Sequence, residues 1–190
     1  MSDPFFFGYG SLVNTATHGF RDVHAASARG WRRAWRHTRL RPVSFLTAVP
    51  DALTRIDGVI AAVPGADWAA LDEREGAYDR VPASEVIDHP AGAGLDIAIY
   101  AIPADRHGPP TEANPILMSY LECVLQGYLR HYGPEGVQHF IATTDGWDAP
   151  ILDDRAAPRY PLHQVIGAEE RTLFGDHLTD AGARILMSLA

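Results

Sequence analysis

Three consecutive phenylalanines near the N-terminus run directly into a glycine-rich turn, and this feature limits the fold most strongly. Phe5, Phe6 and Phe7 precede Gly-Tyr-Gly-Ser at positions 8–11. A short apolar run ended by glycine is typical of a buried strand that stops in a tight turn. Glycines let the backbone approach a ligand closely, and successive N–H groups in such a turn can bind an anion. We therefore expect a buried strand followed by a tight turn; taken alone, the turn favours a plain structural role, with a ligand-binding loop as the alternative.

Three further stretches predict strands, at about residues 30–41, 58–63 and 95–100. The last two are short apolar runs that are followed within three residues by proline, which ends a central strand. Strands and helices mix along the chain without a regular strand–helix–strand alternation. This order predicts an α+β fold, with a small mixed β-barrel-like sheet flanked by helices, in a single domain over residues 1–190.

Capping residues predict the helices. Asp67 is a good N-cap for a short helix that Gly76 would stop. Asn114 is a good N-cap for a longer helix, with Pro115 at its first position and its end at Gly133. The C-terminal stretch is also predicted to be helical.

The short helix places a carboxylate in an unusual position. At 100° per residue Trp68, Leu71 and Glu75 share one face, so Glu75 is expected to point inward from the last turn. Burial, the negative end of the helix dipole and the like charge of Asp72 would each raise the pKa of Glu75. A raised pKa suits a general base near neutral pH. The alternative is a Glu75 that frays at the helix end and lies in water.

The charge pattern limits the classes of function. All 16 basic residues are arginine, against 24 acidic residues, which gives a net charge of −8. The absence of lysine excludes a Schiff-base lysine and a Walker lysine. Six of the arginines lie between Arg29 and Arg41, together with Trp31 and Trp35. A nucleic-acid-binding strand is one interpretation, but a strand whose arginines pair with the acidic surplus fits the net charge better, so no nucleic-acid partner is expected.

Other reactive side chains give weaker signals. No histidines have metal-ligand spacing, so no metal site is predicted. Ser11 lacks the Gly-x-Ser-x-Gly elbow of a serine nucleophile, and Cys123 is predicted to be buried and inert within an apolar helix. A single cysteine fits a reducing, cytoplasmic location, and no stretch reaches the roughly 18 apolar residues of a membrane span, so no membrane partner is expected.

Three motifs in this order resemble those of the gamma-glutamylcyclotransferase superfamily. Residues 7–12, Phe-Gly-Tyr-Gly-Ser-Leu, look like its signature loop. Residues 71–76, Leu-Asp-Glu-Arg-Glu-Gly, resemble the motif that holds its catalytic glutamate. Tyr120 followed by Gly127 resembles a third pair in the same superfamily. The three motifs together favour an inward, functional Glu75 over a frayed one.

The resemblance implies that the chain releases 5-oxoproline from a gamma-glutamyl substrate, by attack of the substrate's own alpha-amine on its gamma-carbonyl. It implies that Glu75 is the general acid and base, and that neither a cofactor nor a metal is required. It also implies a substrate-binding set, which comprises Tyr9, Gly10, Ser11, Leu12, Tyr78 and Tyr120.

The motifs leave the leaving group open. Leu12 is similar to the ChaC-type branch, which acts on glutathione, whereas the second motif looks more like the branch that acts on gamma-glutamyl amino acids. Gamma-glutamyl amines, the oligomeric state (with a homodimer as one option) and the pathway also stay open. Residues 146–161 match no motif; Asp153, Asp154, Arg155 and Arg159 there form either a solvated loop or a flexible lid.

Three other functions are compatible with the sequence. One is a non-catalytic protein of the same fold that binds a small acidic metabolite. Another is a different transferase or hydrolase that acts on a gamma-glutamyl amide. The third is a nucleic-acid-binding module that uses the arginine-rich segment.

Overall fold

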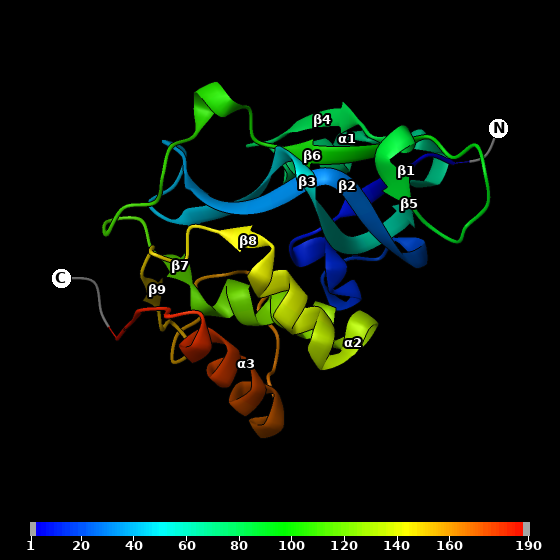
Figure 1. The fold of residues 1–190 in the computed structure, drawn as a ribbon. Helices are drawn as coiled ribbons and strands as arrows, with labels where there is room; N and C mark the ends of the chain where they lie inside the picture. The colour runs from blue at the N-terminus through cyan, green and yellow to red at the C-terminus, as the bar shows by residue number, and fades with distance from the viewer. Residues whose placement is uncertain (1–2, 188–190) are drawn as a thin grey trace.

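A computed structural model describes residues 3–187 and shows a curled mixed sheet with helices on both of its faces (Figure 1). Seven strands form the sheet in the order β4-β6-β1-β3-β2-β5, and β8 pairs with β2. These strands are β1 (Phe5–Gly8), β2 (Arg21–His37), β3 (Ser44–Ala62), β4 (Asp79–Pro82), β5 (Ile87–Asp88), β6 (Ile97–Ala101) and β8 (Thr144–Asp145). A small parallel sheet holds β7 (Ile116–Leu117), β9 (Ile151–Leu152) and β10 (Ile185–Leu186).

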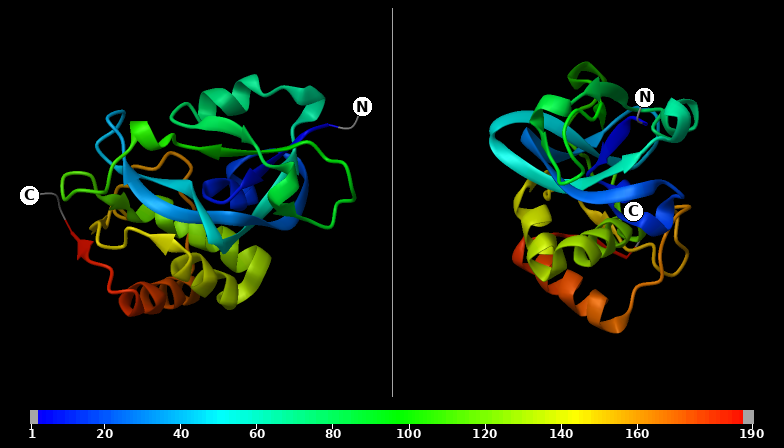
Figure 2. Two further views of the ribbon diagram at one scale, coloured as in Figure 1. Left: turned by 45° about the horizontal axis from the view of Figure 1, so that its top comes forward. Right: turned by 90° about the vertical axis from the view of Figure 1, so that its right-hand side faces the viewer.

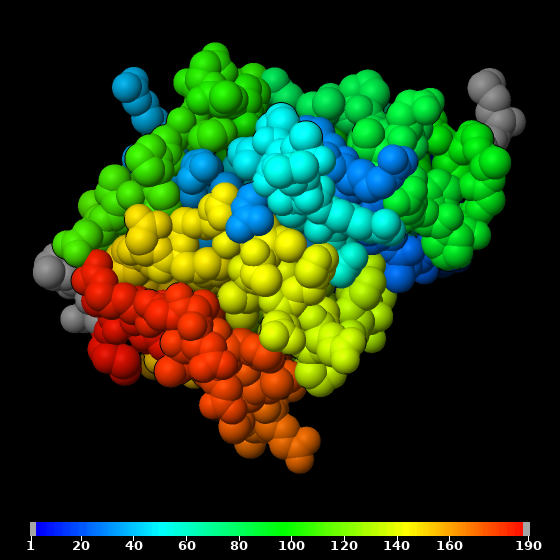
Figure 3. All heavy atoms as spheres, viewed as in Figure 1, coloured from blue at the N-terminus to red at the C-terminus, as the bar shows by residue number. Residues whose placement is uncertain are grey.

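The helices of the described part lie on opposite sides of the large sheet (Figure 2). On one side α2 (Met118–Ala142) packs against the sheet and α3 (Ala168–Asp180) packs against α2, and on the other side lies α1 (Ala69–Arg74). The space-filling view shows α3 against α2 (Figure 3). Single turns of 3-10 helix complete the list: η1 (Ser11–Val13), η2 (Thr15–Thr17), η3 (Pro64–Ala66), η4 (Ser84–Val86) and η5 (Ala104–Arg106). No helix among residues 3–187 is long and apolar enough to cross a membrane.

Strand β1 is buried on both faces, as its phenylalanine run predicts. It pairs antiparallel with β3 and parallel with β6, which makes the sheet mixed, as expected. Because successive strand side chains point to opposite faces, Phe5 and Phe7 pack into the main core between the sheet and α2. Phe6 points the other way and packs with Leu71 of α1. The loop that follows Gly8 therefore leaves a strand that is fixed by packing on both sides.

Strands β2 and β3 form a long bent hairpin. The register shifts between Arg29 and Trp31, where Gly30 has a φ of 77°. Such an irregularity bends a strand pair, which contributes to the curl of the sheet. The predicted strands at 30–41 and 58–63 cover only part of this hairpin. The missed part of β2, residues 21–29, is rich in polar and alanine residues, whereas the missed start of β3, residues 44–49, is largely apolar and was not recognised as a strand.

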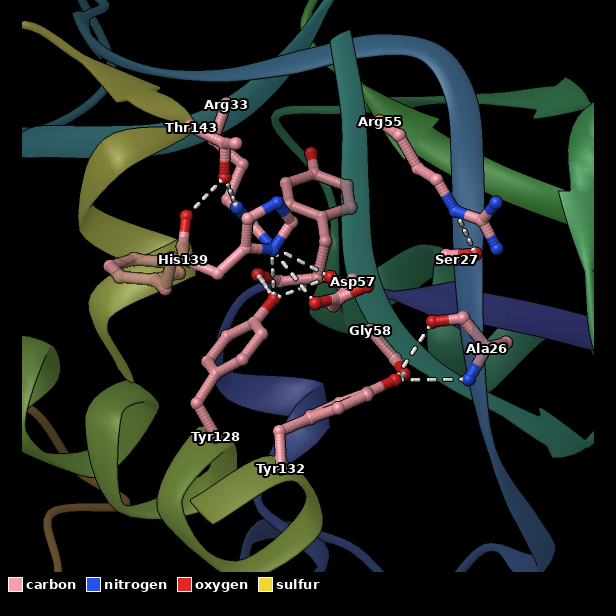
Figure 4. A network of polar contacts seen from close by, with 12 residues as sticks. Ala26, Ser27, Arg33, Arg55, Asp57, Gly58, Tyr128, Tyr132, His139 and Thr143 are labelled. Atoms are coloured by element: carbon pink, nitrogen blue, oxygen red, sulfur yellow. Dashed lines mark hydrogen bonds and ion pairs between the residues drawn. The ribbon is translucent and has the colours of Figure 1, made fainter. Parts of the chain in front are cut away.

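One arginine of the arginine-rich segment is part of the core (Figure 4). The Arg33 guanidinium donates to Thr143 Oγ1 at 2.6 Å, to the backbone oxygen of Asp57 at 2.7 Å and to the hydroxyl of Tyr128 at 2.9 Å. It also lies 4.8 Å from the ring centroid of Phe140. Arg33 thus fastens the hairpin to α2 and is not available to a nucleic acid.

Two other arginines of the segment pair with carboxylates, as the charge pattern predicts, whereas Arg36, Arg39 and Arg41 form no ion pair within residues 3–187. Arg29 lies 3.2 Å from Asp88, and Arg32 lies 2.7 Å from Asp145. The arginine charges of this segment are therefore neutralised only in part.

The N-terminus of α2 differs from the prediction. Asn114 lies in a turn, where its side chain accepts from Thr111, and the helix begins only at Met118. The cap comes from a distant residue: the carboxylate of Asp154 accepts from the backbone N–H of Ser119 at 2.8 Å and from its hydroxyl at 2.6 Å. Asp154 is buried, which contradicts a solvated loop at that residue, whereas Arg155 and Arg159 are exposed, as a solvated loop predicts.

Two further expectations for the helices can be compared with the structure. The long helix does not end at Gly133; it breaks there, at a φ of 67°, and continues to Ala142. The expected C-terminal helix is α3, which buries Phe174 and Leu178. Cys123 is buried within α2, and burial raises the pKa of its thiol to about 12, which agrees with an inert thiol.

Candidate active site

The glycines of the signature loop are required by close contacts. A Cβ atom on Gly8 would lie 2.7 Å from Cβ of Leu12, because the chain folds back into η1 directly after β1. A Cβ atom on Gly10 would lie 2.8 Å from the hydroxyl oxygen of Tyr120. The first glycine therefore permits the turn, and the second leaves room for a side chain of α2.

The loop presents backbone N–H groups that have no acceptor in the part of the chain that the structure describes. The carbonyls of Gly10 and Ser11 accept from the next turn, at 3.0 Å and 3.1 Å. In contrast, no group among residues 3–187 accepts from the N–H groups of Gly10, Ser11 or Leu12. Successive free donors of this kind can bind an oxyanion or a carboxylate.

Tyr9 holds the loop against the sheet. Its hydroxyl donates to the backbone oxygen of Tyr100 at 2.6 Å and accepts from the N–H of Ala48 at 3.0 Å. Burial raises the pKa of Tyr9 far above its usual value, so the phenol stays neutral. Because both hydrogen bonds occupy the hydroxyl, the aromatic ring is the part of Tyr9 that can contact a ligand.

Glu75 follows the last residue of α1 and points inward. The helix is shorter than predicted, and Glu75 forms its C-cap by donating its N–H to the carbonyl of Leu71 at 2.9 Å. Only 16% of the Glu75 side chain is exposed, which excludes a frayed carboxylate. Burial raises the pKa of Glu75, and the Arg74 guanidinium, 3.4 Å away, partly offsets this effect. Asp72 takes no part in the contact between Glu75 and Arg74. Its carboxylate accepts a hydrogen bond from the hydroxyl of Tyr100.

A small cavity of about 30 Å³ brings the predicted site together. Every residue of the predicted catalytic and substrate-binding set lines it. The lining consists of Phe7, Gly8, Tyr9, Gly10, Ser11, Leu12, Leu46, Glu75, Tyr78, Tyr100 and Tyr120. Leu46 and Tyr100 were missing from the predicted set because only the fold brings them to Glu75; Phe7 and Gly8 belong to the quoted loop motif but were not predicted to bind substrate. The loop, the end of α1 and the start of α2 thus meet at one point.

Two tyrosines that line the cavity differ in how firmly they are held. The hydroxyl of Tyr78 donates to the backbone oxygen of Leu46 at 2.8 Å. The hydroxyl of Tyr120 has no bonding partner among residues 3–187, and its ring packs edge-on against Trp35 and Tyr160. Of these two tyrosines, Tyr120 is therefore held less firmly by hydrogen bonds.

The third motif is explained by a close approach between α2 and the loop. A Cβ atom on Gly127 would lie 2.7 Å from the backbone nitrogen of Asn14 and 2.9 Å from the carbonyl carbon of Val13. Tyr120 lies about two helical turns before Gly127 and therefore on a similar face of α2. The glycine lets the helix lie close enough for Tyr120 to reach the loop.

Arg74 belongs to the site, although the sequence gives little signal for it. Its guanidinium donates to the backbone oxygen of Thr17 at 3.0 Å and contacts the hydroxyl of Ser11 at 3.5 Å, in addition to Glu75. The single hint in the sequence is that a basic residue directly precedes the inward carboxylate. Arg74 ties the second motif to the first.

Solved structures share this fold. One described as a gamma-glutamyl cyclotransferase superposes with a TM-score of 0.59 at 13% identity, over 92% of this chain and 99% of its own. An uncharacterized protein from Homo sapiens gives a TM-score of 0.58 at 14% identity, over 92% of this chain and 99% of its own. This chain has the gamma-glutamylcyclotransferase fold.

The fold likeness extends to a third protein, YkqA from Bacillus subtilis. It superposes with a TM-score of 0.58 at 18% identity over 77% of this chain, which spans 57% of YkqA. No protein-family model and no curated protein matches this chain in sequence. The expectation of a gamma-glutamylcyclotransferase-like α+β fold is confirmed by the superpositions.

Proposed function

We propose that this chain is a gamma-glutamylcyclotransferase, which converts a gamma-glutamyl compound into 5-oxoproline and a free amine. The observation that carries the proposal is the shared cavity of Glu75 and the loop at Gly10–Leu12. It places a carboxylate with a raised pKa beside backbone donors that have no acceptor of their own. One group can move protons there while the others hold negative charge.

In the proposed reaction the nucleophile belongs to the substrate. The carboxylate of Glu75 accepts a proton from the alpha-ammonium group, and the freed amine attacks the gamma-carbonyl carbon to form the ring N–C bond. The protonated Glu75 returns that proton to the leaving nitrogen as the amide C–N bond breaks. The second ammonium proton passes from the ring nitrogen through the same carboxylate, so the products are 5-oxoproline and the leaving amine as its ammonium ion.

The remaining residues bind and orient the substrate. The N–H groups of Gly10, Ser11 and Leu12 donate to the oxyanion that forms on the carbonyl, or to the substrate's alpha-carboxylate. The rings of Tyr9, Tyr78 and Tyr120 hold the glutamyl chain in the folded conformation that ring closure requires. Because the attack is intramolecular, this positioning supplies much of the acceleration.

The test measures 5-oxoproline release by mass spectrometry from glutathione, several gamma-glutamyl dipeptides and several gamma-glutamyl amines. Glu75→Gln should reduce kcat by about 10²–10⁴-fold, since the amide keeps the shape but cannot accept the proton. Glu73→Gln is the matched control: it changes an exposed carboxylate on the same helix and should leave kcat unchanged.

The thermal stability of Glu75→Gln distinguishes a loss of catalysis from a folding defect. A carboxyl group whose pKa is raised by folding binds more protons in the native state, so its ionisation lowers stability as pH rises through that pKa. Glu75→Gln removes this cost, and its Tm at neutral pH should equal or exceed that of the parent chain. Full activity of Glu75→Gln would overturn the assignment of the base. Silence of the parent chain on every class of substrate would favour the non-catalytic binding protein.

A further inference from the structure

A second hollow opens beside the Glu75 cavity and continues it. This leaving-group groove has a volume of about 300 Å³ and shares Leu46, Tyr78 and Tyr120 with the cavity. A hollow of this size lies at the low end of the roughly 300–1,000 Å³ typical of small-molecule sites. A larger hollow of about 690 Å³ lies beyond Gly76 and Ala77 but shares no lining residue with the Glu75 cavity. The groove, and not the larger hollow, is therefore where a group leaving the gamma-carbonyl would lie.

Aromatic rings form the walls of the groove. Phe45 meets Tyr78 edge-on, with ring centroids 6.5 Å apart. Tyr120 meets Tyr160 edge-on at 5.0 Å. Rings in this number favour an occupant with a large apolar or aromatic body over one with a small polar body.

The wall that carries Tyr160 is held firmly by the segment that matches no motif. The backbone N–H of Tyr160 donates to the hydroxyl of Ser119 at 3.2 Å, and that of Arg159 donates to Asp154 at 2.9 Å. Because Asp154 also caps α2, the start of the helix and the groove wall are one connected unit. The wall is thus in place before a ligand arrives.

The groove is also cationic, although the whole chain has a net charge of −8. Arg41 and Arg159 line it, and no carboxylate of the described residues does. Among residues 3–187 neither guanidinium forms an ion pair, whereas Arg29, Arg32 and Arg55 all do. Two free guanidinium groups beside an aromatic surface fit an anion such as a carboxylate, which arginine binds through paired hydrogen bonds.

We infer that the groove takes the leaving group of the substrate, and that this group is an amino acid with a large aromatic side chain and a free alpha-carboxylate. The inference rests on the proposed function, because it places the scissile amide at Glu75. In a gamma-glutamyl amino acid the side chain and the carboxylate both lie one carbon from the scissile nitrogen. The rings can therefore hold the side chain while Arg41 and Arg159 hold the carboxylate.

Three substrates distinguish the contribution of the aromatic rings from that of the two arginines. Gamma-glutamylphenylalanine has both groups, gamma-glutamylalanine lacks the ring, and the gamma-glutamyl amide of 2-phenylethylamine lacks the carboxylate. The value of kcat/KM for 5-oxoproline release should be highest for the first and about ten-fold or more lower for each of the others. Equal values for all three compounds, or a preference for alanine or the amine, would overturn the inference and leave the cyclotransferase proposal intact.

Variants test the arginines directly. The double variant Arg41→Gln with Arg159→Gln should lower kcat/KM for gamma-glutamylphenylalanine by about ten-fold and leave that for the phenylethylamide unchanged. Arg39→Gln is the control, because Arg39 is exposed and lies outside the groove. An equal loss on both substrates would contradict a role in carboxylate binding.

Binding to the inactive Glu75→Gln chain distinguishes failure of the inference from failure of the proposed function. Calorimetry should show gamma-glutamylphenylalanine binding about ten-fold more tightly than either of the other two compounds. If the affinities follow this order but the parent chain does not turn over any of the compounds, the proposed cyclotransferase activity is refuted. The inference that the groove binds an aromatic amino acid then stands. Equal affinities for the three compounds would refute the groove, whatever the turnover.

Discussion

At the scale of single residues, Arg74 lies where two parts of the site meet. Its guanidinium contacts Ser11 and Thr17 of the loop region and lies 3.4 Å from the carboxylate of Glu75. Its positive charge lowers the pKa of Glu75, against the larger effect of burial. Arg74 thus sets how far the pKa of the proposed base is raised, and it is a positioning residue in that sense.

Removing this charge should move the pH dependence of the reaction. Because Glu75 must be ionised to accept a proton, kcat/KM falls as pH falls through its pKa. Arg74→Gln raises that pKa further, so the acidic limb of the profile should shift to higher pH, while Arg74→Lys should restore part of the shift. The measurement is kcat/KM against pH at fixed ionic strength.

The control for this shift is Arg80→Gln. Arg80 pairs with Asp72 at 3.3 Å and does not line the Glu75 cavity. Its variant should leave the acidic limb where it is. If the acidic limb of the pH profile does not shift in Arg74→Gln, Arg74 holds the loop in place but does not lower the pKa of Glu75.

Glu75 itself shows what could be predicted for single residues. Its inward position follows from helix periodicity with Leu71, and burial raises its pKa in the expected direction. Asp72, however, is not a cause of that shift, because its carboxylate bonds the hydroxyl of Tyr100 and pairs with Arg80. Periodicity predicts the face on which a side chain lies but not the distant partner that it finds there.

At the scale of elements, the contact between α2 and the loop depends on Gly127. Gly127→Ala would place a Cβ atom 2.7 Å from the backbone nitrogen of Asn14, so helix and loop must separate. The variant should lose about 1–3 kcal/mol of unfolding free energy, as overpacked sites do. Displacement of the loop from Tyr120 should also lower kcat by about ten-fold or more. Chemical denaturation and 5-oxoproline release measure the two effects.

A matched change in another helix isolates the role of that contact. Gly175 lies within α3, and a Cβ atom on it would meet nothing within 4 Å. Gly175→Ala should stabilise the chain by about 0.5–1 kcal/mol, because alanine favours the helix. Similar gains from both variants would contradict a tight contact at Gly127.

The boundaries of elements were harder to predict than their existence. Asn114 and Pro115 have the right chemistry for a helix start, yet α2 begins at Met118 because Asp154 supplies the cap. That carboxylate is distant in sequence, so no local pattern could reveal it. The start of β2 at Arg21 was missed for a similar reason, since its polar residues are ordered by pairing with β3.

At the scale of the whole molecule, the network around Arg33 joins the sheet to the helical layer (Figure 4). The hydroxyl of Tyr128 accepts from Arg33 at 2.9 Å and lies 2.8 Å from the backbone oxygen of Tyr9, in the signature loop. A buried charge is tolerated here because several oxygen atoms and two rings surround the guanidinium. This arrangement depends on the fork shape of arginine.

Arg33→Lys should therefore destabilise the whole chain, although it keeps the charge. A single ammonium group cannot reach Thr143, Tyr128 and the Asp57 carbonyl together, so we expect a loss of about 2–3 kcal/mol of unfolding free energy. For a chain of this size each kcal/mol lowers Tm by about 2–4 °C. The exposed Arg39→Lys is the control and should change the free energy by less than about 0.5 kcal/mol. Equal Tm values for the two variants would contradict the network's role.

The burial of β1 on both faces has a consequence for how such a protein can diversify. The loop of the proposed active site directly follows β1, whose side chains are all buried. Substitutions in β1 therefore disturb the core. Part of the outer wall of the groove comes from residues 41–43 and 159–161, which belong to connecting segments. Substitutions in those segments can exchange one leaving group for another while the chemistry stays constant. Under the proposed function, directed evolution of leaving-group selectivity can therefore target those segments and leave β1 unchanged.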